Sequence, residues 1–463
     1  MCGVFGIHAP GRDVARVTHF GLHALQHRGQ ESAGIAVSDR GRLTVLRDMG
    51  LVTQAFSEQK LRGLLGEIAI GHTRYSTTGS TQWANAQPIV QHGRARTVAL
   101  GHNGNLTNAA ELREELAADG VRLSSSSDTE LIAALIANDS APLGEAVAGA
   151  MRQLEGAYSV TALAEGKLVA FRDPHGFRPL CLGRLEGDCV VASETCALDL
   201  VGAEFERDVA RGEVVVVDET GCRSLQAVAA PVDGALCIFE FFYLARPDTR
   251  LDGIEVHAAR VRMGERLAAE APVDADLVLP IPDSGTPAAI GFSRASGIPF
   301  SEGLIKNRYV GRTFIQPDQG LRQQGIKLKF NPLAEVAGKR LVVIDDSIVR
   351  GNTTRQIVQV LLEAGAAEIH MRVSSPPVIG PCFYGIDLAA EDELIAARRS
   401  VEEVRRHICA TSLAYLSLDG LEEATRRPRS QLCRACLTRD YPTPVPPDLA
   451  ADKFRFEPAV TAR

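Results

Sequence analysis

One segment constrains the fold more than any other: an apolar run that ends in two adjacent acidic residues. Residues 341–344 read Leu-Val-Val-Ile and are followed by Asp345, Asp346 and a short loop rich in Ser, Gly and Thr. A short apolar run bounded by turn residues is typical of a strand buried on both faces of a parallel sheet. Residues 355–364 then have helical composition. The segment therefore predicts a strand–loop–helix unit of an α/β fold.

The rest of the second half repeats this rhythm. Apolar runs at residues 276–280, 340–344 and 369–373 alternate with stretches of helical composition. This alternation predicts an α/β domain built on a parallel sheet. A charged, helix-prone stretch follows at residues 391–409, and residues 442–458 are rich in proline, which favours an extended tail.

The first half has a different organisation, with short alternating strands and interspersed helices. Residues 67–72, 157–163 and 212–217 are strand-like, and residues 109–118 are helical with Asn108 as a plausible N-cap. Pro231 and Gly234 punctuate the chain between the two halves. We therefore expect a first domain over residues 2–232, a second over residues 233–441 and a Pro-rich tail over residues 442–463.

Composition excludes several classes of protein. With 463 residues and 45% hydrophobic content, the chain can bury two or more cores. A net charge of −7 argues against nucleic-acid binding, and no apolar run is long enough to span a membrane. The N-terminus lacks the basic start and long apolar core of a signal peptide, so we expect a cytoplasmic protein. Its ten scattered cysteines then do not indicate a disulfide scaffold.

Residue 2 is the first candidate catalytic position. Met1 precedes Cys2, and removal of Met1 would give Cys2 a free α-amine beside its thiol. With a pKa of roughly 7.7–8.0, such an amine can act as base for the thiol near neutral pH. Taken alone, a cysteine at this position is more often a chance occurrence.

The residues that follow change this interpretation. The Met-Cys-Gly start is followed in order by four further segments: residues 25–34 (LQHRGQESAG), 71–79 (GHTRYSTTG), 101–106 (GHNGNL) and 127–130 (SDTE). Together they resemble the class II glutamine amidotransferases, in which an N-terminal cysteine hydrolyses glutamine and releases ammonia. The resemblance covers about the first half of the chain. It implies an N-terminal-nucleophile fold, in which two antiparallel sheets lie between helical layers (αββα).

The resemblance also implies roles for individual residues. Attack on a carboxamide produces an oxyanion that needs fixed N–H donors, and Asn103 and the Gly104 backbone would supply them. Arg74 would bind the α-carboxylate of glutamine through its planar guanidinium, and Asp128 would bind the α-ammonium. Either charge taken singly would be read as a surface residue.

The acidic pair in the second half suggests a second site. Ligands bind at the carboxyl ends of parallel strands, and a loop at a helix N-terminus suits a phosphate. Two carboxylates suit ribose hydroxyls or a hydrated Mg²⁺, although a surface acidic pair remains an alternative. The segment resembles the phosphoribosyl pyrophosphate (PRPP) signature of type I phosphoribosyltransferases. By this resemblance Asp345 and Asp346 hold the ribose diol, and the 5′-phosphate lies against Ser347, Arg350, Gly351, Thr353 and Thr354; Asn352 stands where many relatives have Thr.

Two further segments fit the same ligand. Residues 279–286 form another strand-to-loop junction, and by resemblance Ser284 lies near Mg²⁺ together with Asp345 and Asp346. Lys306, Arg308 and the cations of residues 322–329 would bind the departing pyrophosphate. Gly311, Gly320 and Gly325 flank those cations, so we expect a mobile lid whose closure couples the two sites.

A glutaminase followed by a PRPP site resembles the amidophosphoribosyltransferase family. This implies glutamine-dependent conversion of PRPP to 5-phosphoribosylamine, pyrophosphate and glutamate, the first committed step of purine synthesis. It also implies Mg²⁺, a homotetramer, and feedback inhibition by purine nucleotides such as AMP, GMP, ADP and GDP. Alternatives are a PRPP-sensing regulatory protein that has lost its chemistry and a glutaminase with another acceptor.

The cysteines of the second half form another candidate site. Cys433 and Cys436 make one Cys-x-x-Cys motif, which alone fits a redox pair, half a zinc site or coincidence. With Cys237 and Cys382, their sequence contexts resemble those of the iron–sulfur subgroup of the family, which implies a [4Fe–4S] cluster; zinc is the runner-up. The other cysteines, Cys181, Cys189, Cys196, Cys222 and Cys409, are expected to be packing residues.

Overall fold

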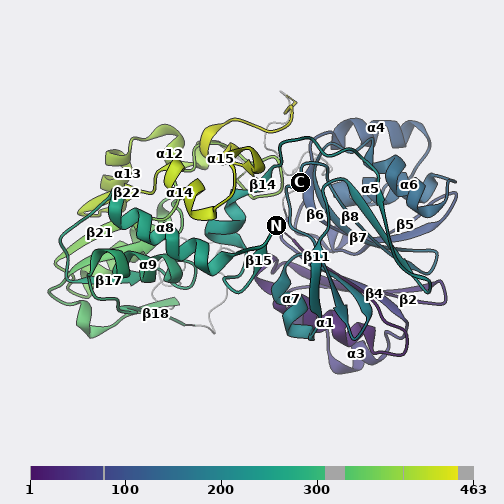
Figure 1. Cartoon of the computed structure of the whole chain (residues 1–463), viewed down its shortest axis with the longest axis horizontal. Coiled ribbons are helices and arrows are strands. Elements are labelled where there is room, and N and C mark those ends of the chain that lie inside the picture. The colour runs from purple at the N-terminus through teal and green to yellow at the C-terminus, as the bar shows by residue number, and fades with distance from the viewer. Residues whose placement is uncertain (1, 77–78, 308–328, 389–390, 447–463) are drawn as a thin grey trace, which may run out of the picture.

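The computed structural model describes residues 2–76, 79–307, 329–388 and 391–446, which form two lobes (Figure 1). The first half of the chain makes one lobe and the second half makes the other. The N-terminus lies between the lobes, so the segment that carries Cys2 is placed at their junction. Within the described residues, no helix has the length and apolar character needed to cross a membrane.

The first lobe is built on two antiparallel sheets. One has seven strands in the order β11-β9-β10-β1-β4-β2-β3, and the other has six in the order β13-β12-β8-β7-β6-β5. The strands of the first sheet are β1 (Gly3–His8), β2 (Ser32–Asp39), β3 (Arg42–Met49), β4 (Ile68–Arg74), β9 (Cys181–Leu185), β10 (Asp188–Ala192) and β11 (Glu204–Asp208). The strands of the second are β5 (Ile89–His92), β6 (Thr97–Leu106), β7 (Gly156–Ala164), β8 (Lys167–Arg172), β12 (Glu213–Asp218) and β13 (Gly221–Gln226).

An apolar core fills the space between these sheets. Val4 and Ile70 of the first sheet pack in one cluster with Leu168 and Val215 of the second. Helices cover the outer faces: α1 (Val14–Ala24), α2 (Val52–Ala55), α3 (Glu58–Arg62) and α7 (Thr195–Val201) on one side, and α4 (Ala109–Ala118), α5 (Asp128–Asn138) and α6 (Leu143–Met151) on the other. The predicted αββα sandwich is confirmed.

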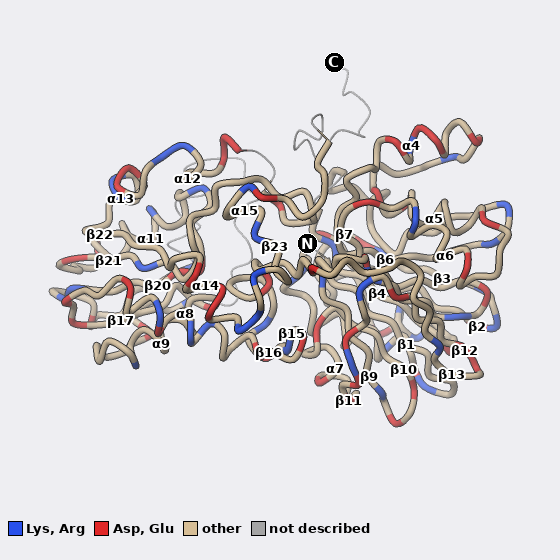
Figure 2. Tube along the Cα trace, turned by 45° about the horizontal axis from the view of Figure 1, so that its top comes forward, with Lys and Arg blue, Asp and Glu red and all other residues tan. Residues whose placement is uncertain are grey.

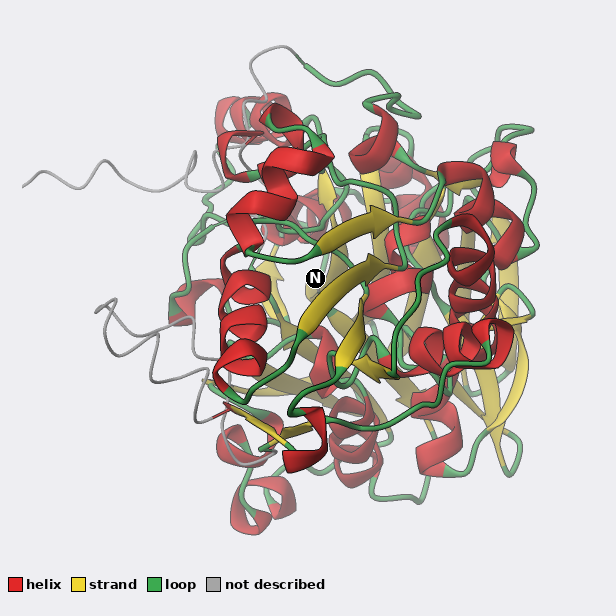
Figure 3. Ribbon diagram, turned by 90° about the vertical axis from the view of Figure 1, so that its left-hand side faces the viewer, coloured by secondary structure: helices red, strands yellow, loops and turns green. Residues whose placement is uncertain are grey.

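The second lobe contains the expected parallel sheet. Its strands lie in the order β17 (Leu277–Pro280), β20 (Arg340–Asp345), β21 (Glu368–Val373) and β22 (Ser412–Tyr415), and all three pairings are parallel. Figure 3 shows helices lying over the strands. The helices of this lobe include α8 (Val256–Glu270), α9 (Thr286–Ser296), α11 (Asn352–Glu363), α12 (Ile395–Arg398), α13 (Val401–Ile408), α14 (Leu418–Thr425) and α15 (Ala435–Thr438). The predicted α/β domain is confirmed.

Shorter elements complete this lobe. A π-helix spans Glu240–Leu244, and three small two-stranded sheets pair β14 (Leu236–Cys237) with β23 (Leu432–Cys433), β15 (Arg250–Leu251) with β16 (Ile254–Glu255), and β18 (Leu304–Lys306) with β19 (Phe330–Pro332). Lys and Arg are interspersed with Asp and Glu along both lobes (Figure 2).

Two local predictions differ from the structure in detail. Helix α4 covers residues 109–118, but the Asn108 side chain does not cap it. That amide instead bonds Gln153 O and Glu155 N, because the neighbouring turn offers both a donor and an acceptor. The helix-prone stretch 391–409 is also divided. Ser400 forms a capping box with Glu403 and starts α13 as a separate helix.

Candidate active sites

Cys2 lies at the start of β1, where the two sheets and the second lobe meet. It is 7% exposed, and its nitrogen donates to Asn103 Oδ1 at 3.3 Å. Its Sγ lies 3.6 Å from the carbonyl oxygen of Tyr75, and its own carbonyl accepts from Arg28 Nε at 3.0 Å. The backbone of the nucleophile is thus held on both sides.

The expected oxyanion donors lie beside this cysteine on β6. Asn103 Nδ2 is buried, and no described residue offers it an acceptor. A buried N–H group without a hydrogen-bond acceptor destabilises the folded protein. An oxyanion hole nevertheless needs such a donor, because the donor must be available when the oxyanion forms. Gly104 has φ +156°, and a Cβ there would lie 1.9 Å from the carbonyl oxygen of Ala157. Only glycine fits this position.

Arg74 and Asp128 line the same small pocket as Cys2. Arg74 is 2% exposed; its guanidinium donates to the carbonyl of Ser80 at 3.1 Å and lies 3.5 Å from Glu31. Asp128 accepts from the Leu106 backbone N–H at 3.0 Å. The two predicted glutamine-binding charges are therefore brought together around the thiol.

His102 is a further pocket residue, for which the sequence predicted no role. Its Nδ1 lies 3.7 Å from Asp128 Oδ1, and its Nε2 lies 3.2 Å from the carbonyl of Ala157. Burial opposes a charge on His102, but the Asp128 carboxylate outweighs this effect and raises the pKa of the imidazole. Burial likewise opposes a charge on Asp128, yet His102 holds its pKa below the usual range. The pair is thus stabilised in its ionised form.

The pocket has a volume of about 10 Å³, which is roughly the space needed by one water molecule. Its walls come from Cys2, residues 74–76, Gln87, His102, Gly104 and residues 127–129. Glutamine is much larger than one water, so these walls must separate before glutamine can enter.

The second lobe forms part of the wall behind the oxyanion donors. Gly385 has φ +98°, and a Cβ there would lie 2.9 Å from both C and O of Gly104. Next to it, Asn105 Nδ2 donates to the carbonyl of Phe383 at 3.1 Å. Tyr75 OH donates to Asp387 Oδ2 at 3.3 Å. One segment of the second lobe therefore touches the glutaminase pocket at several points.

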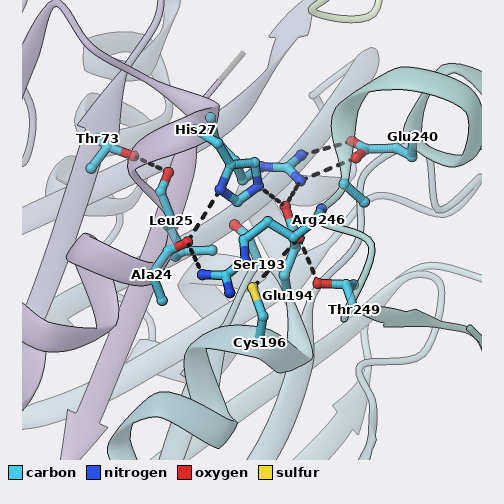
Figure 4. A network of polar contacts seen from close by, with 12 residues as sticks. Ala24, Leu25, His27, Thr73, Ser193, Glu194, Cys196, Glu240, Arg246 and Thr249 are labelled. Atoms are coloured by element: carbon cyan, nitrogen blue, oxygen red, sulfur yellow. Dashed lines mark hydrogen bonds and ion pairs between the residues drawn. The ribbon is translucent and has the colours of Figure 1, made fainter. Parts of the chain in front are cut away.

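A buried ionic network lies beneath Cys2 and joins the lobes. Arg28 pairs with Glu194 and, at 2.7 Å, with Glu240, and Arg178 lies 3.2 Å from Glu240. All four side chains are fully buried. Glu194 also accepts from Thr249 at 2.6 Å and contacts His27 at 2.7 Å (Figure 4). Two cations thus balance two anions, and each is hydrogen-bonded, as buried charges require.

The acidic pair lies at the carboxyl end of β20, beside the end of β17. Asp345 and Asp346 are 8% and 5% exposed. Asp346 accepts hydrogen bonds from Ser284 Oγ and, at 2.5 Å, from Ser347 Oγ. Burial raises the pKa of both carboxyls, and the charge of Asp346 raises that of Asp345 further. The two loops predicted to share one ligand therefore meet at one edge of the sheet.

The predicted phosphate loop leads directly into α11. Gly351 is the N-cap residue with φ +76°, and Thr353 and Thr354 lie in the first turn. Arg350 forms an ion pair with Glu393, and Lys306 forms one with Asp283. Arg308 and residues 311–328, with Gly311, Gly320 and Gly325, lie outside the described residues.

The four predicted cluster cysteines lie in the same region of the second lobe. Cys237 and Cys433 are partners in the parallel β14–β23 pair. Cys382 Sγ accepts two backbone N–H groups, from Tyr384 and Ile386, each at 3.4 Å. Cys237 and Cys436 belong to one apolar cluster and Cys433 to another, and Cys382 packs against both clusters. As the described side chains stand, however, no three His, Cys, Asp or Glu residues are grouped closely enough to hold a metal ion.

Some site residues had a sequence signal and others had none. His102 and Arg28 lie inside segments that resemble the amidotransferases, so a role for them could have been sought. Glu194 and Arg178 lie in segments without a recognisable motif, and Glu240 lies three residues after Cys237 in a segment whose resemblance gave it no role. Their importance comes only from their mutual contact in the folded chain.

Comparisons with known proteins agree with this geometry. Residues 72–200 match the family model described as "Glutamine amidotransferase domain". The amidophosphoribosyltransferase of Synechococcus elongatus is 52% identical, over 100% of this chain and 95% of its own length. That of Archaeoglobus fulgidus is 48% identical, over 96% of this chain and 99% of its own.

Two solved structures share the whole fold. The glutamine PRPP amidotransferase of B. subtilis, in complex with ADP and GMP, superposes with a TM-score of 0.90 at 44% identity and covers 96% of this chain and 98% of its own. A structure described as the allosteric regulatory enzyme of purine biosynthesis superposes with a TM-score of 0.93 at 43% identity, over 100% of both chains. The chain belongs to the amidophosphoribosyltransferase family.

Proposed function

We propose that this chain uses glutamine to convert PRPP to 5-phosphoribosylamine, pyrophosphate and glutamate, as the first committed step of purine synthesis. The observation that carries the proposal is the pocket in which Cys2 lies beside the unmet N–H donor of Asn103. The PRPP-type loop in the same chain supplies the acceptor site. The 52% identity to a named amidophosphoribosyltransferase, over 100% of this chain, supports the combination of a glutaminase site with a PRPP site.

In the glutaminase step, Cys2 Sγ attacks the carboxamide carbon while the free α-amine accepts the thiol proton. Asn103 Nδ2 and the Gly104 N–H receive the negative charge that develops on oxygen. Arg74 and Asp128 fix the carboxylate and ammonium at the far end of glutamine. Ammonia leaves first, and water then releases glutamate from the thioester.

At the second site, Asp345 and Asp346 bind the ribose hydroxyls of PRPP, and Ser347, Arg350, Gly351, Thr353 and Thr354 surround the 5′-phosphate. Ser284, Asp345 and Asp346 would hold Mg²⁺, because their carboxylate and hydroxyl oxygens are the ligand type that this cation prefers and Ser284 lies within hydrogen-bond reach of Asp346. The ion would neutralise the departing pyrophosphate. Lys306 and Arg308 add positive charge for the same leaving group.

Ammonia passes between the sites inside the protein in this proposal, because free ammonia at neutral pH is mostly non-nucleophilic ammonium. The contacts of Asp387 with Tyr75 and of Gly385 with Gly104 offer a route by which the second lobe acts on the glutaminase. We expect the glutaminase to be slow until PRPP binds. In this proposal the stretch that carries the cations of residues 322–329 closes over PRPP as a lid.

A [4Fe–4S] cluster is the second part of the proposal, with Cys237, Cys382, Cys433 and Cys436 as ligands. Four neighbouring thiols suit a cluster, and the two N–H groups that point at Cys382 Sγ favour a bound thiolate. The cluster would connect the C-terminal region, which carries β23, to the PRPP domain, which carries β14. Iron, sulfide and zinc analysis of anaerobically purified protein distinguishes a cluster from a zinc site.

The remaining family properties are also proposed for this chain. They are a cytoplasmic homotetramer, inhibition by AMP, GMP, ADP or GDP, and division into domains 2–232 and 233–441 with a tail at 442–463. The B. subtilis relative, solved with ADP and GMP, supports nucleotide binding. Light scattering and inhibition assays test assembly and inhibitors separately.

The main test measures glutamate and pyrophosphate release from anaerobically purified protein, given glutamine and Mg²⁺, with and without PRPP. Equal release of both, dependent on PRPP, is expected. Cys2→Ala should lose both with glutamine yet still release pyrophosphate when ammonia is supplied, whereas Cys409→Ala should match the wild type. Glutamate release without pyrophosphate would indicate another acceptor, and PRPP binding without turnover would indicate a regulatory protein.

A further inference from the structure

Residues 441–443, near the C-terminal end of the chain, pack against the segment of the second lobe that touches the glutaminase pocket. Tyr441 OH donates to the carbonyl oxygen of Pro381 at 2.9 Å. The Thr443 backbone N–H donates to the Tyr384 hydroxyl at 3.2 Å, and this hydroxyl donates to the Thr443 carbonyl oxygen at 3.3 Å. Thr443 Oγ1 lies 2.9 Å from the same hydroxyl. Residues 441–443 therefore form a strap across residues 381–384, and we call them the C-terminal strap.

Tyr384 is held between the C-terminal strap and the first lobe. Its side chain is buried, and its ring stacks on Phe177 of the first lobe with the two ring centroids 4.1 Å apart. Its carbonyl oxygen accepts from Arg178 Nε at 3.0 Å and from Arg178 Nη2 at 2.7 Å. Burial raises the pKa of Tyr384 to about 12, so the hydroxyl keeps the proton that it donates to the strap at neutral pH. The strap thus holds the hydroxyl end of a residue whose ring and backbone contact the first lobe.

The residues on either side of Tyr384 contact β6, which carries the oxyanion donors. On one side, a Cβ on Gly385 would lie 2.9 Å from the carbonyl carbon and oxygen of Gly104. On the other side, the carbonyl oxygen of Phe383 accepts from Asn105 Nδ2 at 3.1 Å. Gly104 and Asn105 are consecutive residues of β6. The position of residues 383–385 therefore determines where the Gly104 backbone can lie.

We propose that Tyr384 and Thr443 are positioning residues for the oxyanion hole of the glutaminase, an inference that rests on the proposed glutaminase reaction. Thr443 fixes the Tyr384 hydroxyl, and Tyr384 in turn holds residues 383–385 against β6. The Gly104 N–H is thereby kept at the distance from Cys2 Sγ that the developing oxyanion requires. Neither positioning residue lines the glutaminase pocket, so both act through Gly104 rather than on glutamine.

Loss of this positioning should change kcat for glutamine rather than KM. Arg74 donates to the Ser80 carbonyl, and Asp128 accepts from the Leu106 N–H, so the two proposed glutamine-binding residues are held by the first lobe. A misplacement of about 1 Å near the chemistry can cost about 10²-fold in rate, and we expect the smaller shift caused by loss of one hydroxyl to cost about 10-fold. Glutamine should still bind, but the chemical step should be slower.

The test compares glutamine with ammonia as the nitrogen source for the full-length protein, in the presence of PRPP and Mg²⁺. Tyr384→Phe removes the hydroxyl that contacts Thr443 and retains the ring that stacks on Phe177. It should lower the kcat for glutamate release about 10-fold. The KM for glutamine and the ammonia-dependent release of pyrophosphate should stay near the wild-type values.

Variants of Thr443 test the other side of the same contact. Thr443→Val removes only Oγ1 and leaves the backbone bonds, so it should lower kcat less than Tyr384→Phe does. Thr443→Ser keeps this oxygen and should match the wild type. Thr425→Val is the control, because Thr425 is fully buried in the same lobe and its hydroxyl donates within α14 to the Glu422 carbonyl at 2.7 Å. This control should keep the wild-type kcat.

A second measurement separates the oxyanion hole from the thiol. Alkylation of Cys2 by iodoacetamide displaces iodide and forms no oxyanion, so its rate should not fall in Tyr384→Phe. An unchanged kcat for glutamine in Tyr384→Phe would overturn the proposal. So would a fall in the alkylation rate or in the ammonia-dependent rate that matches the fall in glutamine-dependent rate, because it would indicate a general structural defect.

This test is scored on glutamate release and therefore does not depend on the acceptor. Wild-type protein that releases glutamate without pyrophosphate would refute the proposed acceptor reaction, while the comparison of Tyr384→Phe with wild type would still decide the role of Tyr384.

Discussion

Replacing Gly385 by alanine tests whether the second lobe shapes the oxyanion hole. Gly385 is on the second lobe, yet its Cα faces the backbone of Gly104. An added Cβ would lie 2.9 Å from Gly104 C and O and 3.1 Å from its Cα. All three are backbone atoms, so no side-chain rotation relieves the clash.

The size of the effect follows from these distances. Carbon atoms in contact prefer about 3.5–4.0 Å, so the two backbones must separate by roughly 0.6–1 Å. A displacement of this size near the chemistry can cost about 10²-fold, and loss of one oxyanion donor costs about 10²–10³-fold in kcat. We expect Gly385→Ala to lower the kcat for glutamine about 100-fold, with a smaller change in the KM for glutamine.

The assay compares two nitrogen sources in the same preparation. Glutamine-dependent turnover should fall, while ammonia-dependent pyrophosphate release should remain near the wild-type rate. Gly221→Ala is a matched control, since Gly221 has φ +113° but open space around the site of its Cβ. Both variants carry the left-handed backbone penalty of about 1–2 kcal/mol, but only one carries the clash. The reasoning would be refuted if the two variants had equal glutamine-dependent turnover. It would also be refuted if Gly385→Ala lost ammonia-dependent activity to the same extent as glutamine-dependent activity.

Three further changes test other parts of the structure. Arg28→Met leaves two buried carboxylates without their shared cation and should lower the free energy of unfolding by about 3–5 kcal/mol, measured by denaturant titration. Burial opposes ionisation of Glu194, but His27 and Arg28 hold its pKa well below the usual range. The loss of unfolding free energy in Arg28→Met should therefore be greatest above about pH 4.3, the pKa of a glutamate in the unfolded chain. It should become smaller as the pH falls through the lower pKa that Glu194 has in the folded protein. Asp345→Asn should abolish pyrophosphate release while the protein still forms a thioester at Cys2, detectable by mass spectrometry. Cys433→Ser should lower bound iron and sulfide, whereas Cys409→Ser should leave both unchanged.

Local patterns in the sequence predicted much of the architecture. Residues 341–344 are continuously apolar, which is typical of a strand that is buried on both faces. The structure places this strand, β20, between two parallel neighbours. The loop glycine at 351 precedes a helix because a residue with positive φ is needed at that N-cap. Cys2, Arg74 and Asp128 line one pocket, and Asn103 Oδ1 accepts a hydrogen bond from the Cys2 nitrogen, so the structure brings together residues that share the resemblance.

Features that depend on contacts between distant segments could not be predicted. Nothing in the sequence around Glu240 indicates a fully buried carboxylate, and its meaning appears only when Arg28 and Arg178 lie against it. Gly385 reads as an ordinary turn glycine until Gly104 is seen beside it. In each case both partners are required before either has a chemical role.

A continuous series of contacts at the junction of the lobes connects the nucleophile to the oxyanion hole. Arg28 holds the Cys2 carbonyl and pairs with Glu240, which in turn pairs with Arg178. Arg178 donates to the carbonyl of Tyr384 at 2.7 Å, and the next residue, Gly385, touches Gly104. The series begins at Cys2 and ends at Gly104, and its middle members belong partly to the second lobe. A shift of the segment around residue 384 therefore changes the distance between Sγ and the donor, while the glutaminase sheets themselves need not move.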